Sequence, residues 1–262
     1  MKRYIYQYFR MFRLSFMNEM THRENFFMWG LVHTASFVSM IVFFKIIYLG
    51  TTQINGWTQY QALLVLGVAT LITGLGSLTF FPFMYNFGKD VQDGELDMKL
   101  LKPLSVLFQS AFCWVDVEDI IVAPNALILM VFSLWKLSPE YISFNIILFI
   151  LMLISSMILL FSVLTLIQSL ALVLIRVDFI AGFFWSIVNM TKYPAKAIKN
   201  ISQVGLILLV PAAIISSVPA EVLFGRYDWP WIITSLVFSS FLFWLSKKVF
   251  YSSLRHYSSA SS

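Results

Sequence analysis

The chain has few charged residues and a single cysteine. Asp, Glu, Lys and Arg make up 12% of its 262 residues, about half the usual share of about 25%. So few charges could not cover a soluble domain this apolar, and a disordered chain would not be this hydrophobic, which excludes both classes. Because Cys113 is alone, an intramolecular disulfide and a cysteine-based metal cluster are excluded as well.

Motifs for nucleotide hydrolysis and for acid–base catalysis are also lacking. The chain has no Gly-x4-Gly-Lys-Ser/Thr run, so it does not hydrolyse nucleotide through that kind of phosphate-binding loop. Its histidines, His22, His33 and His256, lie far apart in sequence, and we assign none of them as a base or a metal ligand. No ionisable residue falls near the centre of a predicted span, which argues against proton coupling. The energy for any transport would therefore come from a partner.

What the chain has in abundance is apolar sequence. Hydrophobic residues make up 59% of it, with 26 phenylalanines, and the mean hydropathy is +0.81. About 20 apolar residues in a helix cross a bilayer, so we predict an all-α membrane protein of one domain, 1–262, with six transmembrane helices in 26–250. The predicted spans cover about 26–49, 57–83, 119–135, a stretch from 142 onward, 198–218 and 231–250, and a loosely ordered tail covers 251–262.

The first two predicted spans are joined by a tight polar loop, Gly50 to Gly56. Trp57 and Tyr60 then suit an aromatic belt at the membrane surface. Small residues of the second span, Gly67 and Gly74 among them, are expected to pack against other helices. Pro82 is expected to end or kink that span.

Two apolar stretches in the second half have lengths that do not match a single span. Residues 141–175 carry no charge and exceed one bilayer crossing, so we predict one helix that continues beyond the hydrocarbon. A turn near Ser155–Ser156 or near Gln168–Ser169 would instead split this helix. The stretch 179–190 is too short to cross, so the region 176–200 is predicted to be interfacial, re-entrant or buried against a partner.

The first 25 residues carry an amphipathic pattern. Apolar residues recur every three or four positions at Ile5, Phe9, Phe12 and Phe16, which places them on one helix face. Basic residues, including Arg10 and Arg13, flank or oppose that face. We predict a helix in the headgroup layer of the membrane, with an ordinary amphipathic helix packed on protein as the alternative.

Basic residues are divided unevenly between the two predicted faces of the membrane. If both termini are cytoplasmic, 15 of the 18 Lys and Arg residues lie inside, among them Lys192. Only Lys45, Lys136 and Arg226 lie at or near the outside. This distribution follows the positive-inside rule, and it supports cytoplasmic N and C termini.

Three acids, Asp116, Glu118 and Asp119, form a dense cluster before the third predicted span. Asp116 and Asp119 would share a helix face and could bind a cation or act as a general acid and base. They would equally suit a helix start, where acidic side chains face the positive end of the helix dipole. We favour the helix start, and we assign no metal site. The alternative is a membrane-integral, lipid-modifying enzyme that uses these three acids.

The stretch 89–104 interrupts the hydrophobic pattern with charges, and apolar residues such as Leu96, Leu100 and Leu101 stand among them. This pattern indicates a short amphipathic element that docks into another surface. The alternative is a solvated loop whose leucines cover the base of the protein itself.

Several short motifs, taken in order, resemble the permease subunits of ABC type-2 transporters, in the branch of about 260 residues with six spans. The stretch 94–104 resembles their cytoplasmic signature, and Tyr193-Pro194 resembles a Tyr-Pro pair before the fifth span. Pro211 and then Pro219-Ala220 match the proline pattern in and after that span. Residues 257–259 resemble the Tyr-Ser ending of the family.

This resemblance implies a coupling helix that connects the chain to a separate cytoplasmic ATPase. Two copies of the ATPase, holding ATP and Mg²⁺, would bind beneath a pair of permeases, identical or related, and this chain would hold no cofactor. The implied ATPase-coupling residues are Asp93, Gly94, Glu95, Leu96, Asp97, Leu100, Lys102 and Pro103. The resemblance also implies a translocation path or gate at Pro211, Pro219 and Ala220, with 219–230 as an outer-leaflet re-entrant or loop element in which Trp229 is an interfacial anchor.

The function that these observations predict is that of a permease subunit, not itself an enzyme, in a bacterial cytoplasmic membrane. Apolar and aromatic spans would suit export of an amphipathic or lipid-like substrate. An assembly or anchor protein without transport is a third hypothesis.

Overall fold

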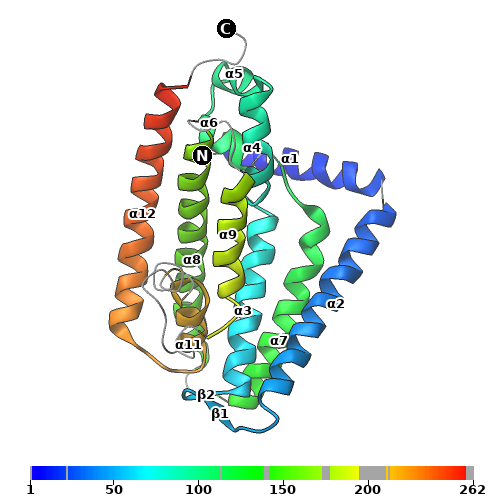
Figure 1. The fold of residues 1–262 in the computed structure, drawn as a ribbon, viewed down its shortest axis with the longest axis vertical. Helices are drawn as coiled ribbons and strands as arrows, with labels where there is room; N and C mark the ends of the chain where they lie inside the picture. Colours follow the sequence, from blue (N-terminus) through cyan, green and yellow to red (C-terminus); the bar gives the residue numbers. More distant parts are fainter. Residues whose placement is uncertain are drawn as a thin grey trace.

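The computed structural model describes residues 2–21, 23–112, 114–138, 142–172, 178–194, 211 and 213–257. They form an elongated bundle of helices, with a short helix-rich cap at one end and a small hairpin at the other (Figure 1). We call these ends the α5 end and the hairpin end. The elements are α1 (Lys2–Thr21), α2 (Arg23–Ile47), β1 (Gln53–Ile54), β2 (Trp57–Thr58), α3 (Gln59–Ser77), α4 (Pro82–Gln92), α5 (Glu95–Leu100), α6 (Val106–Phe112), the 3₁₀ turn η1 (Val117–Ile121), α7 (Val122–Leu137), α8 (Ile142–Ala171), α9 (Asp178–Met190), the π turn η3 (Ala213–Ser217), α11 (Val218–Leu223) and α12 (Trp229–Arg255).

Within the described residues, five helical segments are long and apolar enough to cross a membrane. They are Arg23–Ile47, Gln59–Gln92, Asp119–Leu137, Phe144–Leu170 and Trp229–Arg255. Four of the predicted spans therefore have a matching helix of nearly the same bounds, and the span predicted at 57–83 continues into α4. Most of the span predicted at 198–218 lies outside the described residues, so the number of six stays a prediction.

Helix α3 is the centre of the bundle. The most apolar 18-residue stretch of the segment Gln59–Gln92 is 78% buried, whereas the corresponding stretch of α2 is 11% buried. Gly67 and Gly74 let α7 approach closely, because a Cβ on Gly67 would lie 2.7 Å from Cγ of Met130 and one on Gly74 would lie 3.1 Å from Val122. The expectation that these glycines serve helix packing is confirmed.

The loop predicted between the first two spans is a β-hairpin. Gln53 pairs with Thr58 and Ile54 with Trp57 across a two-residue turn. Asn55 and Gly56 both have positive φ, 50° and 82°, as the tight turn of a right-handed twisted hairpin requires. The predicted tight polar loop is therefore confirmed, and the pairing of its two short strands, which the Asn-Gly pair could have indicated, was missed.

The second spanning helix begins at Gln59 and not at Trp57. Thr58 and Gln61 form a capping box at its start. The backbone N–H of Gln61 donates to Thr58 Oγ1, and the backbone N–H of Thr58 donates to Gln61 Oε1 at 3.0 Å. Trp57 is only 1% exposed and packs edge-on against Phe224. Its expected place in an aromatic belt was therefore wrong, since tertiary packing buries the ring that the sequence placed at a surface.

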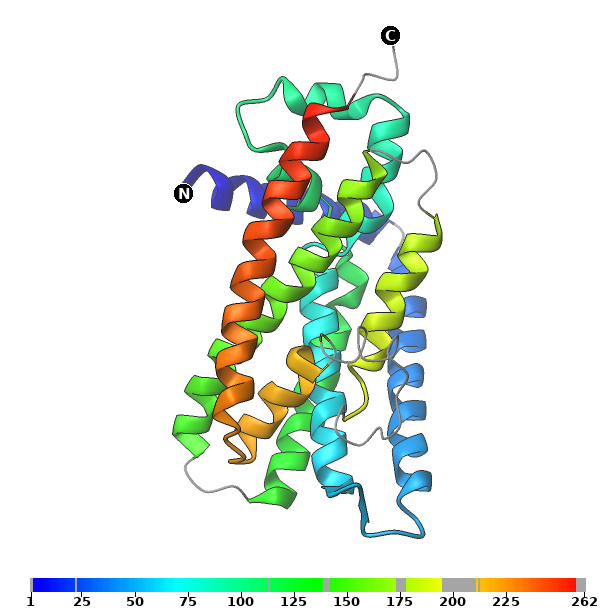
Figure 2. The ribbon, with the colours of Figure 1, turned by 60° about the vertical axis from the view of Figure 1, so that its left-hand side comes forward.

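Helix α8 is continuous over thirty residues, Ile142 to Ala171, as predicted, and neither proposed turn exists. Ser155 instead joins α8 to α12, because its hydroxyl donates to the Ser235 carbonyl at 3.2 Å and lies 2.8 Å from Ser239 Oγ. Helices α8 and α12 lie side by side along most of their length in two views (Figures 1 and 2). Helix α12 extends to Arg255, so the tail predicted from residue 251 begins later.

Helix α9 runs beside the bundle from the α5 end toward the hairpin end (Figure 2). Just beyond it, the ring of Tyr193 lies 5.9 Å from that of Phe44, near the hairpin-end terminus of α2. Lys192 is therefore not at the α5 end with the other basic residues of the cap. The positive-inside count placed Lys192 on the same face as the basic residues of the cap, so for this residue that count differs from the structure.

Candidate functional site

The cap at the α5 end is built from α4, which continues the second spanning segment, and from the short helices α5 and α6. Gly94 makes the turn between α4 and α5 with a φ of 75°, a conformation that glycine adopts without steric cost. Leu96, in the first turn of α5, is fully buried on the side of the helix that faces the cap. Its side chain therefore fixes α5 on the cap, and of the predicted coupling residues it is the one in the core.

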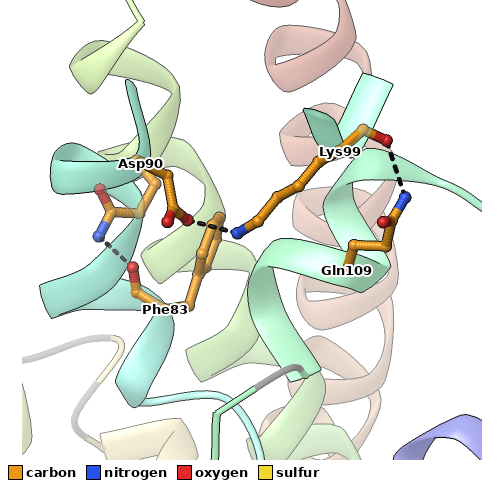
Figure 3. A network of polar contacts seen from close by, with 5 residues as sticks. Phe83, Asp90, Lys99 and Gln109 are labelled. Carbon is orange, nitrogen blue, oxygen red and sulfur yellow. Dashed lines mark hydrogen bonds and ion pairs between the residues drawn. The ribbon is translucent and has the colours of Figure 1, made fainter. Parts of the chain in front are cut away.

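Three buried polar side chains fasten the cap to itself and to the bundle (Figure 3). Asp90 of α4 forms an ion pair with Lys99 of α5. Gln109 of α6 donates from Nε2 to the carbonyls of Lys99 and Leu104, both at 3.0 Å. The third is Gln168 of α8, which donates to the Phe83 carbonyl at 3.0 Å and to the Met84 carbonyl at 2.9 Å. These bonds connect α5 through α4 to α8, which has thirty residues.

The outer side of α5 and the turn after it carry apolar side chains that the described residues leave uncovered. Met98, Leu100 and Leu101 are 63%, 44% and 81% exposed. The other predicted coupling residues flank them in sequence: Asp93, Glu95, Lys102 and Pro103 are exposed, and Asp97 is half-buried. An apolar centre with a charged rim is typical of a protein-binding surface. We call the group Met98, Leu100 and Leu101 the α5 apolar patch.

Helix α1 lies across the bundle near the cap (Figures 1 and 2). Its protein-facing side is made by Tyr4, packed edge-on against Phe108 of α6, and by Tyr8, which donates to the Leu78 carbonyl at 2.9 Å. Burial raises the pKa of the Tyr8 phenol further above neutral pH, where a tyrosine is protonated and can donate in any case. The sequence pattern alone did not single out these two tyrosines.

The predicted apolar stripe of α1 faces away from the protein. Ile5, Phe9 and Phe16 are 55%, 65% and 41% exposed, Phe12 is half-buried, and Arg10 and Arg13 are exposed. A helix with a packed aromatic side and a separate exposed apolar side suits a position at the membrane surface.

The predicted path residues lie on the short segment before α12. Pro219 and Ala220 are buried in α11, which packs against α8 and α3, and Pro211 is half-buried. The Asn145 side chain of α8 donates to the Leu223 carbonyl at 3.1 Å. Residues 218–223 are thus helical and enclosed, with a loop only after them, and Trp229 is half exposed at the start of α12.

The acidic cluster divides in the structure. Asp119 lies in η1, and its Oδ1 is 3.1 Å from Nε2 of His33 in α2. Asp116 precedes η1 as its N-cap residue, and the side chain of Glu118 is outside the described residues. No group of three His, Cys, Asp or Glu side chains suited to a metal ion occurs in the part of the chain that the structure describes. The pairing with His33 was missed, because a histidine near a membrane edge carries no signal of its own.

A helical bundle with several apolar spanning helices and a polar cap at one end defines a multi-pass membrane protein. The family model for ABC-2 family transporter proteins matches residues 34–261, nearly the whole chain. The chain therefore belongs to this family, whose members are transmembrane permease components of ABC transporters and are normally not themselves catalytic. Membership implies association with an ABC ATPase. Neither the curated proteins nor the solved structures gave a match.

Proposed function

We propose that this chain is the permease subunit of an ATP-driven exporter in a bacterial cytoplasmic membrane and that it moves an amphipathic or lipid-like substrate. It would pair with a second permease, identical or related, above two copies of a separate ATPase. The α5 apolar patch would be the surface on which each ATPase docks. The observation that carries this proposal is the exposure of Met98, Leu100 and Leu101 on a cap whose base is fixed by buried polar bonds.

The chemistry of the patch supports docking. Leucine and methionine side chains that remain exposed at the tip of a cap gain free energy when a partner removes them from water, about 25 cal/mol for each Å² of apolar surface. The charges around the patch set the orientation of the partner more than its affinity. Leu101 makes the largest contribution available, because it is 81% exposed.

The internal bonds of the cap would let it transmit motion. An ATPase that presses on α5 would move α4 through the pair of Asp90 and Lys99, and α8 through Gln168. Nucleotide binding can favour one permease state only if the two states differ in their contacts with the ATPase. Because the patch is rigidly connected to α8, a movement of α8 between the two permease states would move the patch and so change its contacts with the ATPase.

The test is co-purification of the tagged chain in nanodiscs, followed by mass spectrometry of its partners. We expect a stoichiometric ABC-type ATPase with the native chain and its loss with Leu101→Asp. Leu49→Asp is the matched control, because Leu49 is 82% exposed at the hairpin end. Retention of the ATPase by Leu101→Asp, or equal loss with both variants, would contradict docking on α5.

A further inference from the structure

A cavity of about 300 Å³, partly open to the surface, lies between α2, α3, α7 and α9. Pockets of about 300–1,000 Å³ are typical of small-molecule sites, so this one has room for a compact ligand and not for a two-chain lipid. Its walls come from both halves of the sequence, with His33 and Met40 on α2, Leu66 and Thr73 on α3, Asp119 before α7, and Trp185 on α9 among the lining residues.

The cavity has an apolar body. Phe37, Met40, Leu66 and Trp185 line it with aromatic, thioether and aliphatic surface. Polar atoms on the α3 side are hydroxyls: Thr70 donates to the Leu66 carbonyl at 2.7 Å, and Thr73 donates to that of Ala69 at 2.7 Å. Their donor capacity is used within the helix, so this wall offers a ligand mainly acceptor atoms and apolar surface.

The ionisable groups of the cavity, the His33–Asp119 pair and Lys192, lie at different heights along the bundle. His33 and Asp119 pair with each other at 3.1 Å on the α5 side of the cavity. Lys192 lines the cavity too, next to Tyr193, whose ring meets Phe44 farther along α2. Phe44 lies eleven positions beyond His33 on α2, which corresponds to about 16 Å along the helix axis. Lys192 is therefore separated from the His33–Asp119 pair along the bundle.

The ammonium of Lys192 has no carboxylate within ion-pair distance in the described part of the chain. The ion pairs found there join His33 with Asp119 and Lys99 with Asp90. Lys192 donates to the neutral Asn189 side chain at 2.9 Å. Lys192 is half-buried, and a cation at membrane depth is costly unless its charge is compensated. Asn189 accepts a hydrogen bond but carries no negative charge, so an anionic ligand would complement the positive charge of Lys192.

We propose that this cavity binds a small amphipathic anion, with its carboxylate or phosphate on Lys192 and its apolar part between Phe37, Met40, Leu66 and Trp185. The inference rests on the proposed function in one respect: the ligand would be the transported substrate or a close mimic of it. It narrows the substrate class from lipid-like compounds in general to single-chain or aromatic anions.

The test uses the full chain in nanodiscs of neutral lipid and an eight-carbon carboxylate that carries a diazirine as the photolabel. We expect labelling of peptides that contain Met40 or Trp185, competition by octanoate, and little competition by octanamide. Lys192→Met should lower the labelling at least tenfold, and Lys192→Arg should retain it. Lys247→Met is the control, since Lys247 is an exposed lysine at the other end of the bundle.

Two results would overturn the proposal. Equal competition by octanamide and octanoate would show that the cavity binds acyl chains without regard to charge, as the tail of a membrane lipid would. Unchanged labelling in Lys192→Met would show that the lysine does not hold the anion. Met40→Trp tests separately whether the label lies in the cavity. The larger side chain should fill the cavity and block labelling although Lys192 is kept.

This experiment needs no ATPase, so its outcome is separate from that of the co-purification. Labelling that depends on Lys192 in a chain that binds no ATPase would support the anion site and contradict the ABC permease function. An ATPase partner without such labelling would support the permease function and reject this cavity as the anion site.

Discussion

Asp90, near the end of α4, and Lys99, near the end of α5, form a buried ion pair across the turn at Gly94. Their side chains are 8% and 11% exposed. Nine positions apart in sequence, they close the cap into a compact loop, and Gln109 and Gln168 continue the connection on either side. The cap thus acts as one unit with the end of α8.

Removing one member of this pair should loosen the cap. Lys99→Met leaves the Asp90 carboxylate buried without its partner, which typically costs about 3–5 kcal/mol. We expect faster hydrogen exchange over residues 93–105 and a lower thermal midpoint. Lys102→Met is the control, because Lys102 is exposed and should leave both measurements unchanged. Native exchange rates in Lys99→Met would reject a structural role for the pair.

The amide of Gln168 satisfies two carbonyls where the chain passes into α4. Gln168→Leu keeps the approximate size of the side chain but removes a second donor from the Phe83 and Met84 carbonyls, which lie within α4, and each such hydrogen bond contributes about 0.5–1.5 kcal/mol. We expect reduced thermal stability and weaker stimulation of the partner ATPase by the permease. Gln53→Leu, on the exposed strand of the hairpin, should affect neither measurement. A Gln168→Leu variant with full stability would contradict the proposed connection.

Close approach of α3 and α7 depends on Gly67. Gly67→Val would place a Cβ 2.7 Å from Met130 Cγ, and overpacking of this kind costs about 1–3 kcal/mol or more. We expect a lower thermal midpoint and less protein recovered in detergent. Gly182→Val is the matched helical control, since nothing lies within 4 Å of a Cβ at that position. Equal stability of the two variants would mean that α7 shifts freely.

The hairpin turn also requires a glycine at Gly56, because the φ of this residue is 82°. Gly56→Ala should destabilise the protein by about 1 kcal/mol, because an L side chain is disfavoured in this region. Gly50→Ala introduces the same methyl group into open space and should have almost no effect. Thermal unfolding of both variants followed by circular dichroism decides the point.

Asp119 distinguishes the permease from the membrane enzyme. Asp119→Asn keeps an oxygen that can accept from His33, so a structural pair should survive with a modest loss of stability, about 1 kcal/mol. We expect co-purification with the ATPase to persist in this variant and in the presence of EDTA. An enzyme that used Asp119 as its acid or metal ligand would lose activity in both cases, and its substrate turnover would be the discriminating assay.

Local patterns predicted the helices well and the faces of the helices poorly. The helical pattern of residues 2–22 correctly indicated α1, and the uncharged run at 141–175 correctly indicated one long helix. The face of α1 that packs on protein is nevertheless made by Tyr4 and Tyr8, which lie outside the apolar stripe. Which side of an amphipathic helix meets lipid and which meets protein depends on neighbours far away in sequence, such as Phe108 and Leu78.

For the candidate sites, too, local sequence indicated the segment and not the contacts of its individual residues. Charges among leucines at 89–104 are enough to indicate a segment outside the membrane, because such a mixture cannot remain in hydrocarbon. The pattern could not show that Leu96 is core while Leu101 is exposed, since both are leucines in one amphipathic run. His33 and Asp119, 86 positions apart, carried no signal of their pairing.

By itself, the sequence determined that this chain uses lipid as part of its solvent, where the five spanning helices of its described residues lie, and which stretch forms a polar cap. These properties follow from composition and periodicity, which act over about 20 neighbouring residues. Only the tertiary structure decided that Lys192 enters a cavity beside Met40 and Trp185, and that Asp90, Lys99 and Gln168 tie the cap to α8. Such contacts join residues that are separated in sequence, and helix packing alone brings them together.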